Sequence, residues 1–136
     1  MAKQFTLGKN ERLKSRKLIE ELFSNGKNFN LFPFKVYYVL SETPDSRLPT
    51  QFGVGVSGKN FKRAVDRNRI KRLIREAYRL QNLSLKEKLK EKKYQLNIFF
   101  IYTDKEVPDF NFIKEKLAVA LKKMEMIIDE NIPSHS

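Results

Sequence analysis

Apolar and polar positions follow two different periods along the chain, and each period predicts its own secondary structure. Apolar side chains occupy every second position over residues 34–40 and 51–57, as in strands with one buried face. A third strand, almost continuously apolar, is predicted over 94–103. Apolar residues recur every three or four positions over about 9–24, 64–80 and 110–128, which predicts amphipathic helices. This order of elements predicts a compact α+β sandwich of helices against a small sheet.

Turn and capping residues mark the ends of these elements. Gly26 follows the first helix, where glycine often ends a helix, and Asp109 can cap the last one. The lysine- and glutamate-rich stretch 84–93 is open to two interpretations, a short helix or a charged connector, and we favour a solvated spacer. The sequence shows no internal repeat or domain boundary. We therefore expect residues 1–136 to form a single domain with flexible ends at about 1–8 and 130–136.

The helix predicted over 64–80 has an apolar side and a strongly basic side. At about 100° per residue its apolar residues form one stripe: Ile70, Leu73, Ile74, Ala77 and Leu80. The polar side carries a nearly unbroken set of cations with one amide: Arg67, Asn68, Lys71, Arg72, Arg75 and Arg79. Only Asp66 and Glu76 interrupt this set. Because so many like charges repel one another, this side predicts a polyanionic partner whose phosphates the cations would hold.

The composition extends this interpretation to the whole chain. Its 136 residues include 28 Lys and Arg against 16 Asp and Glu, a net charge of +12. The chain has no cysteine, which excludes disulfides and thiolate metal sites. No stretch approaches the ~20 apolar residues of a membrane span, and the first four residues lack the apolar core of a signal peptide. We therefore expect a soluble, basic, cytoplasmic protein without membrane contacts.

The segment from Gly53 to Gly58 has the spacing GxGxxG that is typical of dinucleotide-binding turns. Valines alternate through the segment, which places its glycines within a strand rather than in the turn after one. About 20 residues later, where that fingerprint has a strand-ending acid, Glu76 lies in the middle of a helix. We therefore interpret the match as accidental.

The same strand offers a shallow surface to a single-stranded nucleic acid. We expect small residues on one of its faces to lie beside alternate residues of a neighbouring strand: Gly53, Gly55 and Ser57 with Lys35, Tyr37 and Val39. Bases could stack on aromatic rings there while phosphates bind the cation, and Phe23 and Tyr37 are the candidate stacking groups. Two alternatives stay open: a half-exposed sheet face that only avoids crowding, and burial of Phe23 in the core.

Candidate catalytic groups are sparse. The one histidine, His135, stands next to the last residue of the chain. The carboxylates in the predicted loops lack the paired spacing of a metal or acid–base site: Asp45, Asp104, Glu106 and Asp109. Asp66 is expected to cap or neutralise the start of the basic helix. We assign the chain no catalytic residue, no metal ligand and no cofactor of its own.

The run RNRIKRLIRE, from Arg67 to Glu76, strongly resembles the RNR signature of the protein subunit of bacterial ribonuclease P. The likeness covers most of the chain in the family's order. It includes Arg12-Leu13-Lys14 opening the first helix, Phe23 with Gly26 closing it, and residues 54–57 before the signature. The late strand and the last helix follow as well. On these residues the chain is identified as a member of that family.

The resemblance implies a fold and a division of labour. The family fold is a two-layer αβββαβα sandwich with a small mixed sheet, like the second domain of ribosomal protein S5. Its βαβ crossover is left-handed, whereas general rules favour the right hand. Ribonuclease P is an endonuclease that removes the 5′ leader of precursor tRNA, and its RNA subunit performs the hydrolysis with magnesium ions. The protein, expected to be monomeric, would bind the RNA subunit and the leader without catalysing the reaction.

The resemblance also assigns roles to individual residues. The surface facing the catalytic RNA would include Arg67, Asn68, Arg69, Lys71, Arg72 and Arg75, to which the helix pattern adds Arg79. A cleft for the single-stranded leader would include Phe23, Lys35, Tyr37, Ser57 and Lys59. Mutating the first set should weaken RNA binding, and mutating the second should weaken only binding that depends on a leader.

Four positions depart from the family pattern. Ile19 stands where many members have a second cleft phenylalanine, Lys35 where an apolar residue is common, and Gly55 where serine is common. The link 58–63 is one residue longer than in some relatives, which leaves the alignment of Lys59 open by one position. Two other functions remain as alternatives: a ribosomal-type RNA binder, which would not depend on a leader, and a nuclease that cleaves RNA unaided.

Overall fold

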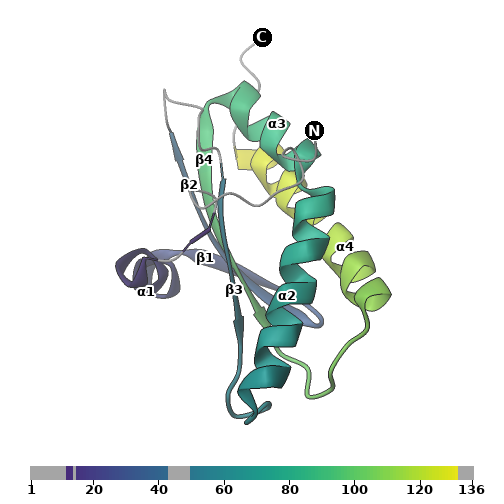
Figure 1. Cartoon of the computed structure of the whole chain (residues 1–136). Helices are drawn as coiled ribbons and strands as arrows, with labels where there is room; N and C mark the ends of the chain where they lie inside the picture. Colours follow the sequence, from purple (N-terminus) through teal and green to yellow (C-terminus); the bar gives the residue numbers. More distant parts are fainter. Residues whose placement is uncertain (1–11, 14, 43–49, 132–136) are drawn as a thin grey trace.

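The computed structural model describes residues 12, 13, 15–42 and 50–131 of the chain. These residues form four helices and four strands (Figure 1). In chain order they are α1 (Arg16–Asn25), β1 (Lys27–Leu31), β2 (Phe34–Glu42), β3 (Thr50–Val56), α2 (Ala64–Gln81), α3 (Leu83–Lys92), β4 (Tyr94–Tyr102) and α4 (Phe110–Asn131). The predicted α+β class is confirmed, with α3 added to the αβββαβα order.

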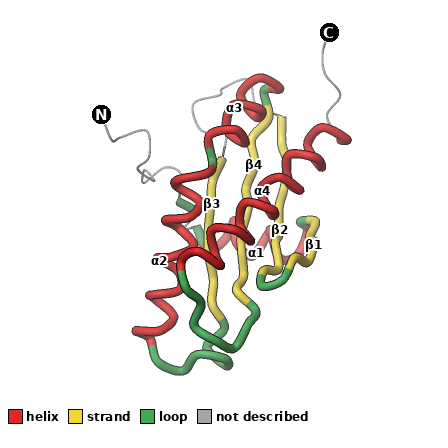
Figure 2. Tube along the Cα trace, turned by 90° about the vertical axis from the view of Figure 1, so that its right-hand side faces the viewer, coloured by secondary structure: helices red, strands yellow, loops and turns green. Residues whose placement is uncertain are grey.

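The four strands form one mixed sheet in the order β1-β2-β4-β3. β2 pairs antiparallel with both β1 and β4, whereas β3 and β4 run parallel. The chain passes from β3 to β4 through α2 and α3 (Figure 1). Seen from the helical side, with both strands pointing down, β4 lies to the right of β3, so the crossover is left-handed (Figure 2). The hand is that implied by the family resemblance and opposite to the general preference.

Helices cover both faces of the sheet (Figure 1). α2 and α4 lie on one face over the larger core cluster, which includes Ile70, Phe100 and Leu117. α1 lies on the other face over a smaller cluster centred on Leu22 and Phe99. Because β4 is covered on both sides, its sequence is almost continuously apolar rather than alternating.

The stretch 84–93 belongs to α3, and the expectation of a solvated spacer is wrong. Leu85 and Leu89 stand one helical turn apart and are fully buried, while most of the surrounding lysines and glutamates face outward. The Nζ of Lys88 lies 2.6 Å from Asp129 of α4. The sequence did not reveal this helix because its buried side consists of only two leucines among many lysines and glutamates.

The first helix also differs from the expectation, since it begins at Arg16 rather than near Lys9. The Ser15 side chain accepts a hydrogen bond from Leu18 N and caps the helix there. Before that cap, Arg12 forms an isolated parallel bridge with Phe52, and Leu13 N donates to Phe52 O at 2.8 Å. The chain therefore runs along the free edge of β3 before it turns into α1.

Three smaller differences concern element boundaries and faces. β1 was not identified from the residue pattern, because its five residues carry only one buried side chain. On α2, Leu80 is exposed, and Tyr78 is fully buried instead, stacked on the Phe52 ring at 3.9 Å between centroids. α4 continues to Asn131, so 130 and 131 are helical; residues 1–8 and 132–136 lie outside the described part. The cap predicted at Asp109 is confirmed by its 2.8 Å bond from Phe112 N.

Candidate nucleic-acid interface

The polar side of α2 presents cations in two different states. Arg69 and Arg72 are exposed, and their side chains make no hydrogen bond or ion pair with any other residue that the structure describes. Asn68 is exposed beside them, and Lys71 is half-buried. These side chains are therefore wholly or partly exposed to solvent.

Arg67 and Arg79 are already engaged within the protein. The Nη1 of Arg67 donates to the carbonyl oxygens of Phe61 and Lys62 at 2.7 and 2.9 Å. Arg79 donates from both Nε and Nη2 to the carboxylate of Glu76, which also raises the pKa of Arg79. Counting cations along the helix did not reveal these partners, because the carbonyls come from the link before the helix and Glu76 was counted as an interruption.

Arg75 adjoins a cation from outside the helix. It is half-buried, and burial, together with repulsion from Arg12, lowers its pKa. Arg12 reaches this place because its segment runs along the edge of β3. Two guanidinium groups near one another raise the local positive potential. Arg12 was quoted only as a family match and not as a site residue, so its proximity to α2 is new information from the structure.

A cluster of aromatic rings lies on the opposite face of the sheet, against α1. The Phe23 ring, 44% exposed, contacts Tyr37 at 4.8 Å and Phe99 at 5.4 Å between centroids. The Nζ of Lys35 lies 5.3 Å from the centre of the Tyr37 ring. The cluster therefore combines exposed aromatic surface with a cation, and Phe23 is not buried in the main core.

The glycine face of β3 does not lie beside β2, as predicted, but beside β4, whose Phe99 ring covers it. β4 lies between β2 and β3, so Tyr37 and Gly53 are both in register with Phe99 rather than with each other. A Cβ built on Gly53 would lie only 2.6 Å from Phe99 Cδ2, so the glycine makes room for this ring. Phe99 is thus a member of the cluster that the sequence did not single out. It stands beside Phe100 in an almost continuously apolar strand, so the sequence pattern does not show which of the two rings faces α1.

Ser57 and Lys59 lie at the end of β3 and in the turn that follows it. Ser57 follows β3 directly and is four residues beyond Gly53, about 13 Å at the rise of an extended chain. Its hydroxyl accepts a hydrogen bond from Lys59 N at 3.2 Å, and the Lys59 side chain is exposed. Phe23, Lys35 and Tyr37 therefore lie together in the aromatic cluster, whereas Ser57 and Lys59 belong to the polar turn that follows β3.

The sequence matches the family model described as Ribonuclease P over residues 7–125. The chain belongs to the ribonuclease P protein family. It is 38% identical over 130 residues to the ribonuclease P protein component of Porphyromonas gingivalis, covering 96% of this chain and 91% of that protein. The component of Chlorobium phaeobacteroides is 30% identical over 122 residues, covering 83% and 84%.

Solved structures show the same fold. The ribonuclease P protein of Thermotoga maritima superposes with a TM-score of 0.62 at 26% identity, covering 83% of this chain and 96% of that one. The Staphylococcus aureus protein superposes with a TM-score of 0.63 at 23% identity, covering 84% and 94%. As a ribonuclease P protein, the chain acts with an RNA subunit in the 5′ processing of tRNA.

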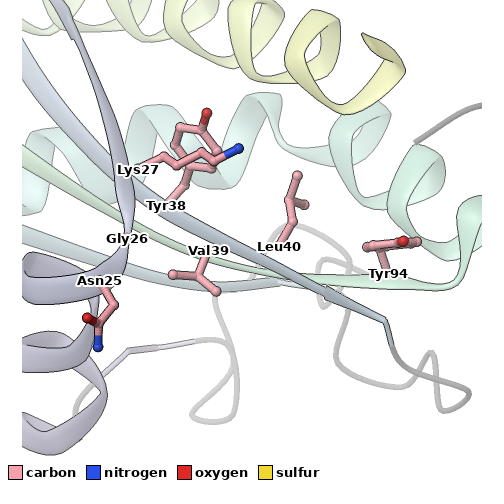
Figure 3. A pocket seen from close by; sticks show the side chains of 7 residues that line it. All are labelled: Asn25, Gly26, Lys27, Tyr38, Val39, Leu40 and Tyr94. Atoms are coloured by element: carbon pink, nitrogen blue, oxygen red, sulfur yellow. The ribbon is translucent and has the colours of Figure 1, made fainter. Parts of the chain in front are cut away.

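This ribonuclease P protein also has a depression of about 220 Å³ away from the candidate residues. It lies at the outer edge of β2, where β1 begins, and Figure 3 shows Tyr38 and Leu40 on the α4 side with Val39 on the other. Its lining comprises Asn25, Gly26, Lys27, Tyr38, Val39, Leu40 and Tyr94. None of these residues belongs to the α2 surface or to the aromatic cluster.

The described residues hold neither a metal-binding cluster nor a membrane-spanning helix. They contain no group of three or more His, Cys, Asp or Glu side chains placed to hold a metal ion. Among the helices of the described part, none is both long and apolar enough to span a bilayer.

Proposed function

We propose that this ribonuclease P protein makes two separate RNA contacts, one on each side of its sheet. The α2 contact would hold phosphates of the structured RNA subunit. Its members are the cations and the amide that stay available on that helix: Asn68, Arg69, Lys71, Arg72 and Arg75, with Arg12 beside them. Arg79 shares its charge with Glu76 and would contribute less.

The second contact would take the single-stranded 5′ leader of precursor tRNA along the α1 face. The observation that carries this assignment is the exposed ring of Phe23 packed on Tyr37, with Lys35 over the Tyr37 ring. Exposed aromatic rings beside a cation suit bases that stack and phosphates that need a counter-charge. Ser57 and Lys59 would contact the leader at the other end of the face.

The remaining features of the proposal follow from this division of labour. The protein would act as a monomeric, single RNA-binding domain of the cytoplasm. It would bind no cofactor itself, and magnesium ions would serve the RNA subunit.

Leader binding is tested with Phe23→Ala and Tyr37→Ala, each assembled with the RNA subunit. A stacked base is worth about 1–3 kcal/mol, so affinity for precursor tRNA should fall roughly 5- to 150-fold, while affinity for mature tRNA stays unchanged. Tyr37→Phe keeps the ring and is the matched control. Equal losses for precursor and mature tRNA would contradict the cleft assignment, and unfolding midpoints of each variant separate binding losses from stability losses.

The α2 contact is tested by the salt dependence of binding to the RNA subunit. The slope of log K against log salt is negative. Replacing Arg72 by alanine should make it shallower by about 0.7–0.9, the value of one phosphate contact. Arg72→Lys keeps the charge and should keep the slope. An unchanged slope in Arg72→Ala would exclude a phosphate contact at that position.

Cleavage of precursor tRNA at low magnesium separates the alternatives. We expect efficient cleavage only when protein and RNA subunit are combined. Cleavage by the protein alone would indicate an active site of its own. No effect of added protein would favour a ribosomal-type RNA binder.

A further inference from the structure

Arg67 differs from the other cations of α2 in what its side chain holds. Its Nη1 donates to Phe61 O at 2.7 Å and to Lys62 O at 2.9 Å. Both carbonyls belong to the link between β3 and α2. Hydrogen bonds from a charged donor are shorter and stronger than neutral ones. The side chain therefore fastens the link to the first turns of the helix.

In the described part of the chain, α2 begins without a side-chain capping hydrogen bond. The N-cap residue is Arg63, whose side chain makes no capping hydrogen bond. By contrast, Ser15 caps α1 and Asp109 caps α4 through their side-chain oxygens. Arg67 does not accept hydrogen bonds from the first-turn N–H groups as a capping side chain would, but its two donated bonds tie the preceding link to the helix.

The link that Arg67 holds also forms the polar end of the proposed leader cleft. Phe61 N donates to Ser57 O at 3.0 Å, and Phe61 O accepts from Arg67. Phe61 itself is buried, with its ring 6.1 Å from that of Tyr102. A continuous path of short contacts therefore runs from Ser57 through Phe61 to Arg67 in α2.

We propose that Arg67 is a positioning residue that fixes the Ser57–Lys59 turn relative to the basic side of α2, and that it does not act as a phosphate ligand. The proposal rests on the two RNA contacts described above, which it couples: one end of the leader cleft is held by the helix that meets the RNA subunit. The leader in the cleft and the RNA subunit on α2 are then held at a fixed distance from each other. Pre-ordering of this turn removes part of the conformational entropy that leader binding would otherwise lose.

Two substitutions separate positioning from phosphate binding. Arg67→Lys keeps the charge, but the lysine side chain is shorter and does not reach both carbonyls with the same geometry. Arg67→Ala removes charge and connection together. If Arg67 positions the link, the two variants behave alike; if it binds phosphate, lysine rescues what alanine loses.

The first readout uses no leader. In both Arg67 variants we expect the wild-type slope of log K against log salt for binding to the RNA subunit. Arg72→Ala should make that slope shallower by about 0.7–0.9. We also expect amide hydrogen exchange at Phe61 to rise about tenfold in both variants, because the turn opens more often. A shallower slope in Arg67→Ala, or unchanged amide hydrogen exchange at Phe61 in either variant, would overturn the proposal.

The second readout compares precursor with mature tRNA on the assembled holoenzyme. Both variants should lose about three- to tenfold in affinity for the precursor and nothing for mature tRNA, the range expected when one charged hydrogen-bond pair no longer orders the turn. Wild-type affinity in Arg67→Lys with a loss in Arg67→Ala would again identify a charge contact and refute positioning. Should Tyr37→Ala leave precursor affinity intact, the leader cleft itself would be wrong, while slope and exchange would still decide the role of Arg67.

Discussion

Gly53 gives the sharpest test of how the aromatic cluster is built. The glycine is extended, and a Cβ added to it would lie 2.6 and 2.8 Å from Cδ2 and Cε2 of Phe99. Carbon atoms pack best at about 3.5–4.0 Å, so the ring must move by about 1 Å in Gly53→Ala. Phe23 and Leu13 stand in the way of that movement.

The magnitude follows from two opposing effects. Overpacking a tight site costs about 1–3 kcal/mol, whereas replacing glycine by alanine within a strand gains about 0.5–1 kcal/mol. Gly53→Ala should therefore destabilise the protein by up to about 2.5 kcal/mol. It should also weaken binding of leader-bearing substrates, because Phe99 would be pushed against Phe23.

Urea unfolding of a short glycine series measures this effect. A Cβ on Gly55 would lie 3.0 Å from Phe99 Cε1, a milder overlap, and one on Gly58 would meet nothing within 4 Å. We expect the unfolding midpoints to rank Gly53→Ala lowest, Gly55→Ala next and Gly58→Ala at or above the wild type, with equal m-values. Equal midpoints for Gly53→Ala and Gly58→Ala would refute the reasoning, since Phe99 would then not restrict this face.

Three further predictions concern stability. Leu89→Ala removes a fully buried side chain of α3 and should cost about 2–5 kcal/mol by urea unfolding; a loss below about 1 kcal/mol would restore the spacer interpretation. Asp109→Ala removes the cap on Phe112 N and should cost about 1 kcal/mol, with Asp109→Asn, which keeps a capping oxygen, as control. Burial raises the pKa of Tyr102 well above its usual value, so this group favours the folded state below pH ~10 and loses that contribution at higher pH, where the unfolded chain ionises first. Tyr102→Phe, which also loses the 2.7 Å bond to Glu106 O, should cost about 0.5–1.5 kcal/mol at pH 7 and should flatten the fall in stability above pH 10; an equally steep fall would contradict this assignment.

Periodicity determined most of the elements, because the burial of one face leaves a direct trace in the sequence. The alternation over 34–40 and 51–57 corresponds to β2 and β3, and the mixed apolar and basic sides of 64–80 correspond to α2. The pattern fails where few residues carry it: β1 has one buried side chain, and α3 has two buried leucines among lysines and glutamates. Signals of that size do not stand out from the surrounding composition.

The sequence by itself also determined the family, since the RNR run and its flanking residues occur in one order along the chain. Only the tertiary structure decided which cations are available. Arg67 and Arg72 look alike in the helical pattern, but one holds backbone carbonyls and the other faces solvent. It likewise placed β4 between β2 and β3, so that Phe99 fills the space over Gly53. Local sequence records which side of an element is buried, whereas the partner of each side chain depends on how distant segments pack, and periodicity carries no information about that.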